Sequence, residues 1–252
     1  MNDRYPPILA EATADDILAV LRDSHRQQCT HDPEANPDIS LTHESTIAEW
    51  RDACDLLPWI KVAEAMNGYW SVSIPREQWR EVLEPPKQRA LRGVCELVAR
   101  QAKLRRIRPA GILGSNCIPA GAFLTIRSYL AQAGADVSDV GPSTPLREYT
   151  RRYPGVFLGP VSQLAPGILP LVKIRTPVYD AFIFGMLVAW VGMLVGWCSG
   201  SLGIGILAVL LFAMCYLGVW TIGRWVLPAS VEFRGLETFR DLSKLIAASA
   251  RT

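Results

Sequence analysis

The chain has 252 residues, of which 50% are hydrophobic and 20% charged, and its formal net charge is +2. Because Lys and Arg balance Asp and Glu over residues 1–180, bulk electrostatic attraction to nucleic acid is excluded as the main activity. Residues 181–223 contain no charged side chain, and this uneven distribution excludes both a wholly soluble protein and a polytopic transporter.

The start of the chain indicates a cytoplasmic location for residues 1–180. Residues 1–16 lack an apolar core and include several acidic side chains, so they do not form a secretory signal peptide. The 6 cysteines are scattered without a Cys-x-x-Cys pair, which favours reduced thiols over a disulfide framework.

Apolar residues at helical spacing predict a small all-α, four-helix bundle in residues 1–101. A long polar loop follows the first helix as far as Glu44. The predicted helices cover residues 14–28, 58–70, 76–83 and 88–101. The second of them has an apolar stripe formed by Trp59, Val62, Ala63, Met66 and Trp70.

This order of helices, with Ile74-Pro75 before the short third helix, resembles acyl carrier proteins over about residues 12–101. Carriers bear phosphopantetheine on the serine of an Asp-Ser-Leu motif at the start of their second helix. In carriers this serine lies about 18 residues before the isoleucine of the Ile-Pro pair. Counting back by that spacing from Ile74 reaches Leu56, so Asp55-Leu56-Leu57 occupies the place of that motif. A leucine has no oxygen to carry a phosphodiester, so the resemblance implies a degenerate carrier without this cofactor.

Leu56 is therefore expected at the start of the second helix, partly buried against the bundle. Two alternatives stay open: an unrelated four-helix bundle, and a working carrier that is modified at Ser71 or Ser73.

A second, split carrier-like unit is expected in residues 121–178 together with 227–252. Its opening is an apolar-faced helix that ends at Gly134 and is followed by Pro142-Ser143-Thr144-Pro145-Leu146. Leu227-Pro228 and the apolar-faced tail helix after it resemble the carrier's closing part. The tail should then pack on residues 122–133, through Phe123, Ile126 and Leu130, whereas the alternative places it flat on a bilayer.

Residues 102–120 are interpreted as a basic linker between the two units. The basic run from Lys87 to Arg108 is opposed only by Glu96. It could contact anionic lipid headgroups, an acidic partner or the acidic first segment of this chain, or it could be a solvated face. Nucleic acid is not expected, because no aromatic residues are interleaved in the run.

The uncharged run predicts two transmembrane helices, since one span needs only about 20 residues. We expect a hairpin over residues 179–226, with its turn at Ser199-Gly200-Ser201. Lys173 and Arg175 precede it and Arg224 closes it, which places both chain ends on the cytoplasmic side of a bacterial inner membrane.

Small residues at four-residue spacing in the first membrane helix indicate close helix packing. These residues are Gly192, Gly196 and Gly200, and they make the hairpin a candidate for self-association. Glycine is also common in membrane helices in general, which is the simpler explanation.

The sequence contains no nucleotide-binding, metalloprotease or hydrolase motif, and an enzyme is not expected. His25, Cys29 and His31 lie close together, and His25 and Cys29 share a helix face. Their spacing does not match a closed zinc site, and a Cys-His nucleophile would also need an orienting group. No catalytic residue, metal or cofactor is therefore assigned.

The sequence favours a non-catalytic, membrane-anchored interaction or scaffold protein with degenerate carrier-like domains and an unknown protein partner. The alternative is a membrane effector whose cytoplasmic domain controls a two-helix, pore-forming segment.

Overall fold

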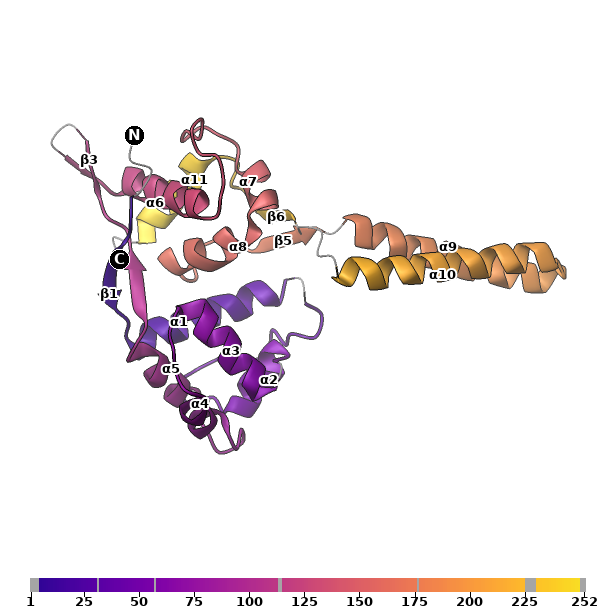
Figure 1. Cartoon of the computed structure of the whole chain (residues 1–252), viewed down its shortest axis with the longest axis horizontal. Helices are drawn as coiled ribbons and strands as arrows, with labels where there is room; N and C mark the ends of the chain where they lie inside the picture. The colour runs from indigo at the N-terminus through magenta and orange to yellow at the C-terminus, as the bar shows by residue number, and fades with distance from the viewer. Residues whose placement is uncertain are drawn as a thin grey trace. The chain divides into compact units, whose positions relative to one another are not determined.

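The computed structural model describes residues 5–30, 32–56, 58–112, 115–175, 177–224 and 230–249 (Figure 1). The chain divides into two compact units. One unit contains residues 1–173 and 232–252, and the other contains residues 174–231. Most of the described residues are helical and the strands are short, which confirms the all-α class.

The first part of the larger unit contains five helices, one more than predicted. They are α1 (Ala14–Gln28), α2 (Ile47–Cys54), α3 (Trp59–Trp70), α4 (Arg76–Leu83) and α5 (Leu91–Ala99). The missed helix α2 begins with a capping box, in which Thr46 accepts from the Glu49 N–H and Glu49 accepts from the Thr46 N–H. Glu84-Pro85-Pro86 ends α4 as predicted, and the Glu84–Pro85 peptide bond is cis.

The core of these five helices consists of the apolar faces that the helical spacing indicated. Trp79, Ile17 and Leu91 are completely buried, and α1 packs on α5. In α3, Val62, Ala63, Met66 and Trp70 are buried and Trp59 is partly buried against the same core, which confirms the predicted stripe.

Most of residues 102–120, the segment interpreted as a linker between the two units, is strand or helix. β2 (Lys103–Arg106) pairs antiparallel with β1 (Ile8–Glu11), and Lys103 forms an ion pair with Glu11. β3 (Ala110–Ile112) pairs antiparallel with β4 (Ser115–Cys117). β1 and β2 are far apart in sequence, and β3 and β4 are only three residues long, so local periodicity revealed neither pairing.

The second part of the larger unit is built around α6 and the tail helix. Its helices are α6 (Ile118–Gln132), α7 (Leu146–Arg152), α8 (Pro154–Val156) and α11 (Phe239–Ser249), with a π-helical turn (Phe157–Val161) and a 3-10 turn (Ser162–Leu164). α11 packs on α6 (Figure 1), where Ile126, Leu130, Phe239 and Leu242 are completely buried. The predicted packing of the tail is therefore confirmed.

The two parts repeat the same hydrogen-bonded connection, which we call the closing bridge. In the first part, the Leu91 N–H donates to the Ser45 carbonyl at 2.8 Å. In the second part, the Phe239 N–H donates to the Thr144 carbonyl at 3.2 Å. Two further pairs of backbone hydrogen bonds match. The Ile47 N–H donates to the Arg89 carbonyl as the Leu146 N–H donates to the Glu237 carbonyl. The Arg92 N–H donates to the His43 carbonyl as the Arg240 N–H donates to the Pro142 carbonyl.

The turn before each closing bridge and the burial of each last helix also match. The Thr42 N–H donates to Ser45 Oγ, and the Gly141 N–H donates to Thr144 Oγ1, both at 2.9 Å. The inward-facing positions of α5 and α11 correspond one to one. These buried pairs are Leu91 with Phe239, Val94 with Leu242, Cys95 with Ser243, and Val98 with Ile246. The matching elements are α1, α2 and α5 in the first part and α6, α7 and α11 in the second, so we call residues 14–99 the first repeat and residues 118–152 with 239–249 the second repeat.

The smaller unit consists mainly of two long helices, inserted in the chain between α7 and α11. α9 (Pro177–Ser199) and α10 (Leu202–Arg224) match the two predicted helices and pack on each other. β5 (Val172–Arg175) precedes α9, and β6 (Ser230–Phe233) follows α10; the two strands form a two-stranded sheet. The Leu227-Pro228 pair of the carrier resemblance lies outside the described residues.

Candidate functional site: the α3–α4 groove and the apolar hairpin

The position that corresponds to the carrier serine lies in the turn between α2 and α3. Asp55 has left-handed backbone angles (φ 42°) and ends α2, and the Leu56 N–H donates to the Arg51 carbonyl at 3.1 Å. Leu56 is partly buried against the core, as predicted. The prediction that it begins a helix is wrong, because α3 starts only after Pro58. Leu57 lies outside the described residues.

Acidic side chains lie beside this turn. A hydrogen bond between the carboxyl groups of Glu34 and Asp55, together with the negative charge of Asp55 and Asp32, raises the pKa of Glu34. No group of three or more potential metal ligands occurs among the residues that the structure describes. The leucine is therefore placed next to negative charge, without a hydroxyl group to modify.

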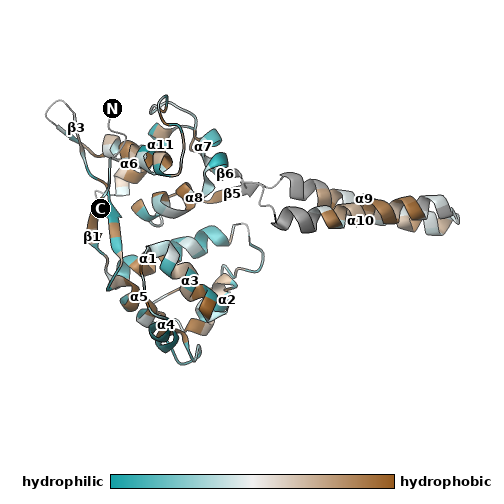
Figure 2. Cartoon of the chain, in the orientation of Figure 1, coloured by the Kyte–Doolittle hydropathy of each residue, from teal (hydrophilic) through white to brown (hydrophobic). Residues whose placement is uncertain are grey.

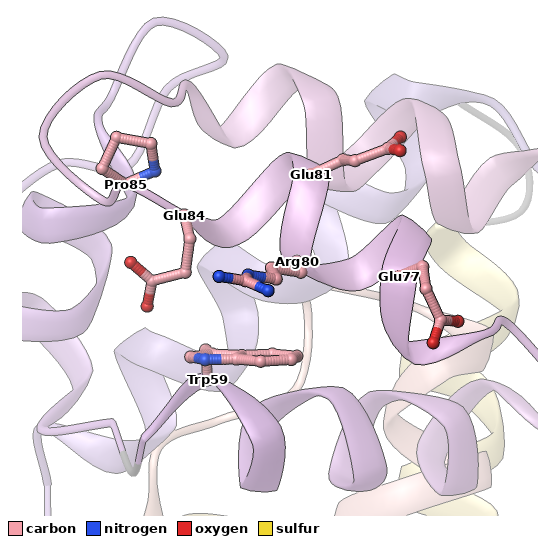
Figure 3. A pocket seen from close by; sticks show the side chains of 6 residues that line it. All are labelled: Trp59, Glu77, Arg80, Glu81, Glu84 and Pro85. Atoms are coloured by element: carbon pink, nitrogen blue, oxygen red, sulfur yellow. The ribbon is translucent and has the colours of Figure 1, made fainter.

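A groove of 780 Å³ lies beside α3 and α4 (Figure 3). Its lining residues are Trp59, Glu77, Arg80, Glu81, Glu84 and Pro85. In Figure 3 the Arg80 guanidinium extends over the Trp59 indole, and the Glu84 carboxylate lies on the same side of the ring. The lining contains three carboxylates and one guanidinium, so its charged groups are mainly negative. Its apolar part consists of an indole and a proline ring.

The ends of α3 and α4 are fixed to each other next to this groove. The Glu64 carboxylate accepts from Lys61 at 3.1 Å and from Arg76 at 2.8 Å, so it joins the two helices. Asn67 accepts from the indole N–H of buried Trp79 at 3.1 Å and exchanges two hydrogen bonds with the Ile74 backbone. The groove is therefore preformed rather than assembled by a mobile loop.

His25 and Cys29 are brought together, but their geometry does not suit a nucleophile. Cys29 Sγ lies 3.3 Å from His25 Nε2, and the same Nε2 lies 3.0 Å from the Asn36 carbonyl oxygen. A carbonyl only accepts, so Nε2 carries a proton and cannot take one from the thiol. Burial raises the pKa of the Cys29 thiol, which further disfavours the thiolate. His31 lies outside the described residues.

The glycines of the hairpin bring α9 and α10 together within one chain. A Cβ atom at Gly192 would lie 3.2 Å from the Ala208 Cβ, and one at Gly218 would collide with the Phe182 ring. Gly196 is buried, and its carbonyl accepts from the Ser201 N–H at 3.1 Å. The packing role predicted for Gly200 is wrong, because its positive φ (65°) places it in the turn between the helices.

The coloured parts of α9 and α10 are largely hydrophobic (Figure 2), and many of their large apolar side chains are exposed. Trp197 is 89% exposed and Phe184 is 69% exposed. Within the described residues, α9 contains one stretch that is long and apolar enough to cross a membrane, Phe182–Ser199. α10 contains a shorter apolar stretch, Gly205–Gly218.

The chain matches no protein family, and comparison with curated proteins and with solved structures found no similar protein.

Sequence reasoning missed the α3–α4 groove and half of the hairpin packing. Arg80 lies on α4 and Trp59 on α3, so only the packing of the two helices brings these side chains together in the groove. Gly185 and Gly218 approach α10 and α9 as closely as Gly192 does. Gly185 precedes Gly192 by seven residues, and this heptad spacing could have identified it as an interface position.

Proposed function

We propose that the protein is a non-catalytic, membrane-anchored interaction protein, in which two degenerate carrier-like repeats are attached to the inner membrane by a two-helix hairpin. The observation that carries the proposal is the insertion of the apolar hairpin inside the second repeat. Contacts between α11 and the segments before the insertion, α6 and residues 142–146, form although the hairpin separates them in sequence. The repeat can therefore fold while the hairpin occupies a bilayer. Both chain ends are then cytoplasmic.

The contacts of the hairpin glycines favour an anchoring role over a pore. Gly192 faces Ala208 of the same hairpin, and Gly218 faces Phe182. These close approaches use Gly192 and Gly218 to form the hairpin itself, whereas Gly196, Gly200 and Gly205 line an open apolar groove near the turn. The exposed faces consist of large apolar side chains without charge, which suits contact with lipid and offers no hydrophilic lining for a channel.

The partner is a protein segment that binds in the α3–α4 groove. The excess of carboxylates at Glu77, Glu81 and Glu84 favours a cationic segment, and the exposed face of Trp59 favours an apolar or aromatic side chain at its centre. The repeats supply a binding surface and not a prosthetic group, because Leu56 cannot be acylated through phosphopantetheine.

Labelling of single cysteines in intact cells tests the topology. Ser201→Cys should react with a membrane-impermeant maleimide from outside, whereas Ser249→Cys should react only after permeabilisation. The background needs the native cysteines replaced, and Cys198 first of all, because it is exposed near the turn. Labelling of Ser249→Cys in intact cells, or protection of Ser201→Cys, would contradict the two-pass arrangement.

Photo-crosslinking tests the interaction. A photo-reactive amino acid at Glu81 should give a discrete adduct with another protein in cells, while the same group at the exposed control position Gln101 should not. Charge reversal by Glu77→Lys should remove the adduct. If Glu81 gives no adduct, or if Glu77→Lys leaves the adduct unchanged, while the topology is as expected, the groove is not the partner site.

A further inference from the structure

A second pocket lies at the contact between the first repeat and the segment that leads into β5. It has a volume of 480 Å³ and is formed by the end of α1, the loop 37–41 and Leu171. Its lining residues are Arg22, His25, Arg26, Cys29, Thr30, Pro37, Asp38, Ile39, Ser40, Leu41 and Leu171. This volume is in the range of small-molecule sites.

Two guanidinium groups are fixed in this pocket. Arg22 and Arg26 are four residues apart, so they lie on one face of α1. Arg22 Nε donates to the Leu41 carbonyl at 2.6 Å, and its terminal N–H groups make no hydrogen bond within the described part of the chain. Arg26 is held by Asp23 and by the Leu169 carbonyl, each at 2.6 Å. Their positions are thus set before any ligand binds.

The remaining lining combines apolar walls with the polar side chains of His25, Cys29, Thr30 and Ser40. Ile39, Leu41 and Leu171 provide the apolar surface, and Leu171 is 45% exposed at this point. Ser40 is exposed in the loop and can donate. Asp38 is the acidic side chain in the lining, and the buried carboxylate of Asp23 pairs with Arg26, so the charge of Arg22 is the one left for a ligand. The pocket therefore offers the Arg22 guanidinium on one side and an apolar surface on the other.

The wall that contains Leu171 is attached to α1 by side-chain hydrogen bonds. Gln27 accepts from the Val172 N–H at 2.9 Å and donates to the Pro170 carbonyl at 3.2 Å. Thr30 donates to the Val172 carbonyl at 2.8 Å. A molecule in the pocket would contact both α1 and this segment, so its binding would favour the attached state.

We propose that this pocket binds a small soluble organic phosphate, whose phosphate group lies between Arg22 and Arg26 and whose apolar part contacts Ile39 and Leu171. Guanidinium groups suit phosphate oxygens because they donate two parallel hydrogen bonds. Bound ligand holds residues 169–172 on α1, and so controls the segment that runs into β5 ahead of the hairpin. This ligand is independent of the protein partner of the α3–α4 groove.

The test uses the full-length protein in neutral detergent and phenyl phosphate as the probe. Hydrogen exchange of a peptide that contains Val172 should slow saturably at millimolar phenyl phosphate, and inorganic phosphate at equal ionic strength should be less effective. Arg22→Gln should weaken the apparent affinity about tenfold or more, as expected for loss of a charged hydrogen bond. The control Arg100→Gln removes an exposed guanidinium that lines neither groove nor pocket, and it should leave the response unchanged.

A second variant, Ser40→Asp, adds a carboxylate on the exposed loop without altering α1, and it should abolish the protection. Protection that is equal in Arg22→Gln and wild type overturns the site, and so does absence of any protection in the wild type. Equal effects of phenyl phosphate and inorganic phosphate overturn the apolar half of the assignment. Protection by anionic lipid without any by phenyl phosphate overturns the soluble ligand.

Discussion

Phe239 tests whether α11 completes the second repeat or serves as a surface helix. Its side chain is completely buried, with the rings of Tyr149, Phe123 and Phe157 at centroid distances of 5.4, 6.2 and 6.5 Å. Truncating a buried phenylalanine costs about 3–5 kcal/mol, including aromatic pairs of about 0.5–1.5 kcal/mol each. Since domains are stable by only about 5–15 kcal/mol, Phe239→Ala should release α11 from α6.

Limited proteolysis of the full-length protein in membranes measures this release. Phe239→Ala should expose α6 and α7 to cleavage, while Lys244→Ala, on the solvated side of the same helix, should digest like the wild type. Leu91→Ala is the matched variant in the first repeat, and it should sensitise α5 and leave α6 and α7 protected. A wild-type digestion pattern for Phe239→Ala would refute the closing role of α11.

Three further variants test other contacts. Gly121→Ala would place a Cβ against the Arg108 carbonyl and should destabilise the unit by about 1–3 kcal/mol in thermal unfolding. Hydrogen bonds from Thr238 hold the pKa of Asp241 in the folded protein below its usual value. The ionised carboxylate therefore stabilises the fold at pH above the pKa of Asp241 in the unfolded chain, and this stabilisation is lost as the pH falls through the lower pKa of the folded state. Asp241→Asn should therefore lower Tm at neutral pH, and the difference from wild type should vanish in acid; a constant difference would show that charge is not involved. Gly218→Val should separate α9 from α10, detected as loss of a disulfide engineered across the hairpin, and persistence of that disulfide would contradict the close packing.

The elements that the sequence predicted well have strong local signals. α4 spans Arg76–Leu83 as predicted, because Pro75 fixes its start and the prolines after Glu84 fix its end. The hairpin helices follow from the uncharged run alone. α2 was missed because eight residues give little periodicity, although Thr46 and Glu49 form a recognisable capping box.

The site was less predictable, because its contacts are non-local. The proximity of Trp59 and Arg80 depends on how α3 packs on α4, and the pocket on α1 requires Leu171, which is remote in sequence from Arg22. The resemblance of residues 121–149 and of the tail to the opening and closing parts of acyl carrier proteins indicated that the tail should pack on α6. It could not reveal that the closing bridge is made by the same backbone groups in both repeats.

The position of the hairpin inside the second repeat also sets an order of events during synthesis. α6 leaves the ribosome with Ile126 and Leu130 uncovered, and the helix that covers them is made only after α9 and α10. The first repeat has no such delay, since its five helices are contiguous. The nascent chain therefore carries an exposed apolar face while the most hydrophobic segment of the protein is still being made. That interval favours delivery to a membrane before folding is complete, and exposes any stalled chain to aggregation.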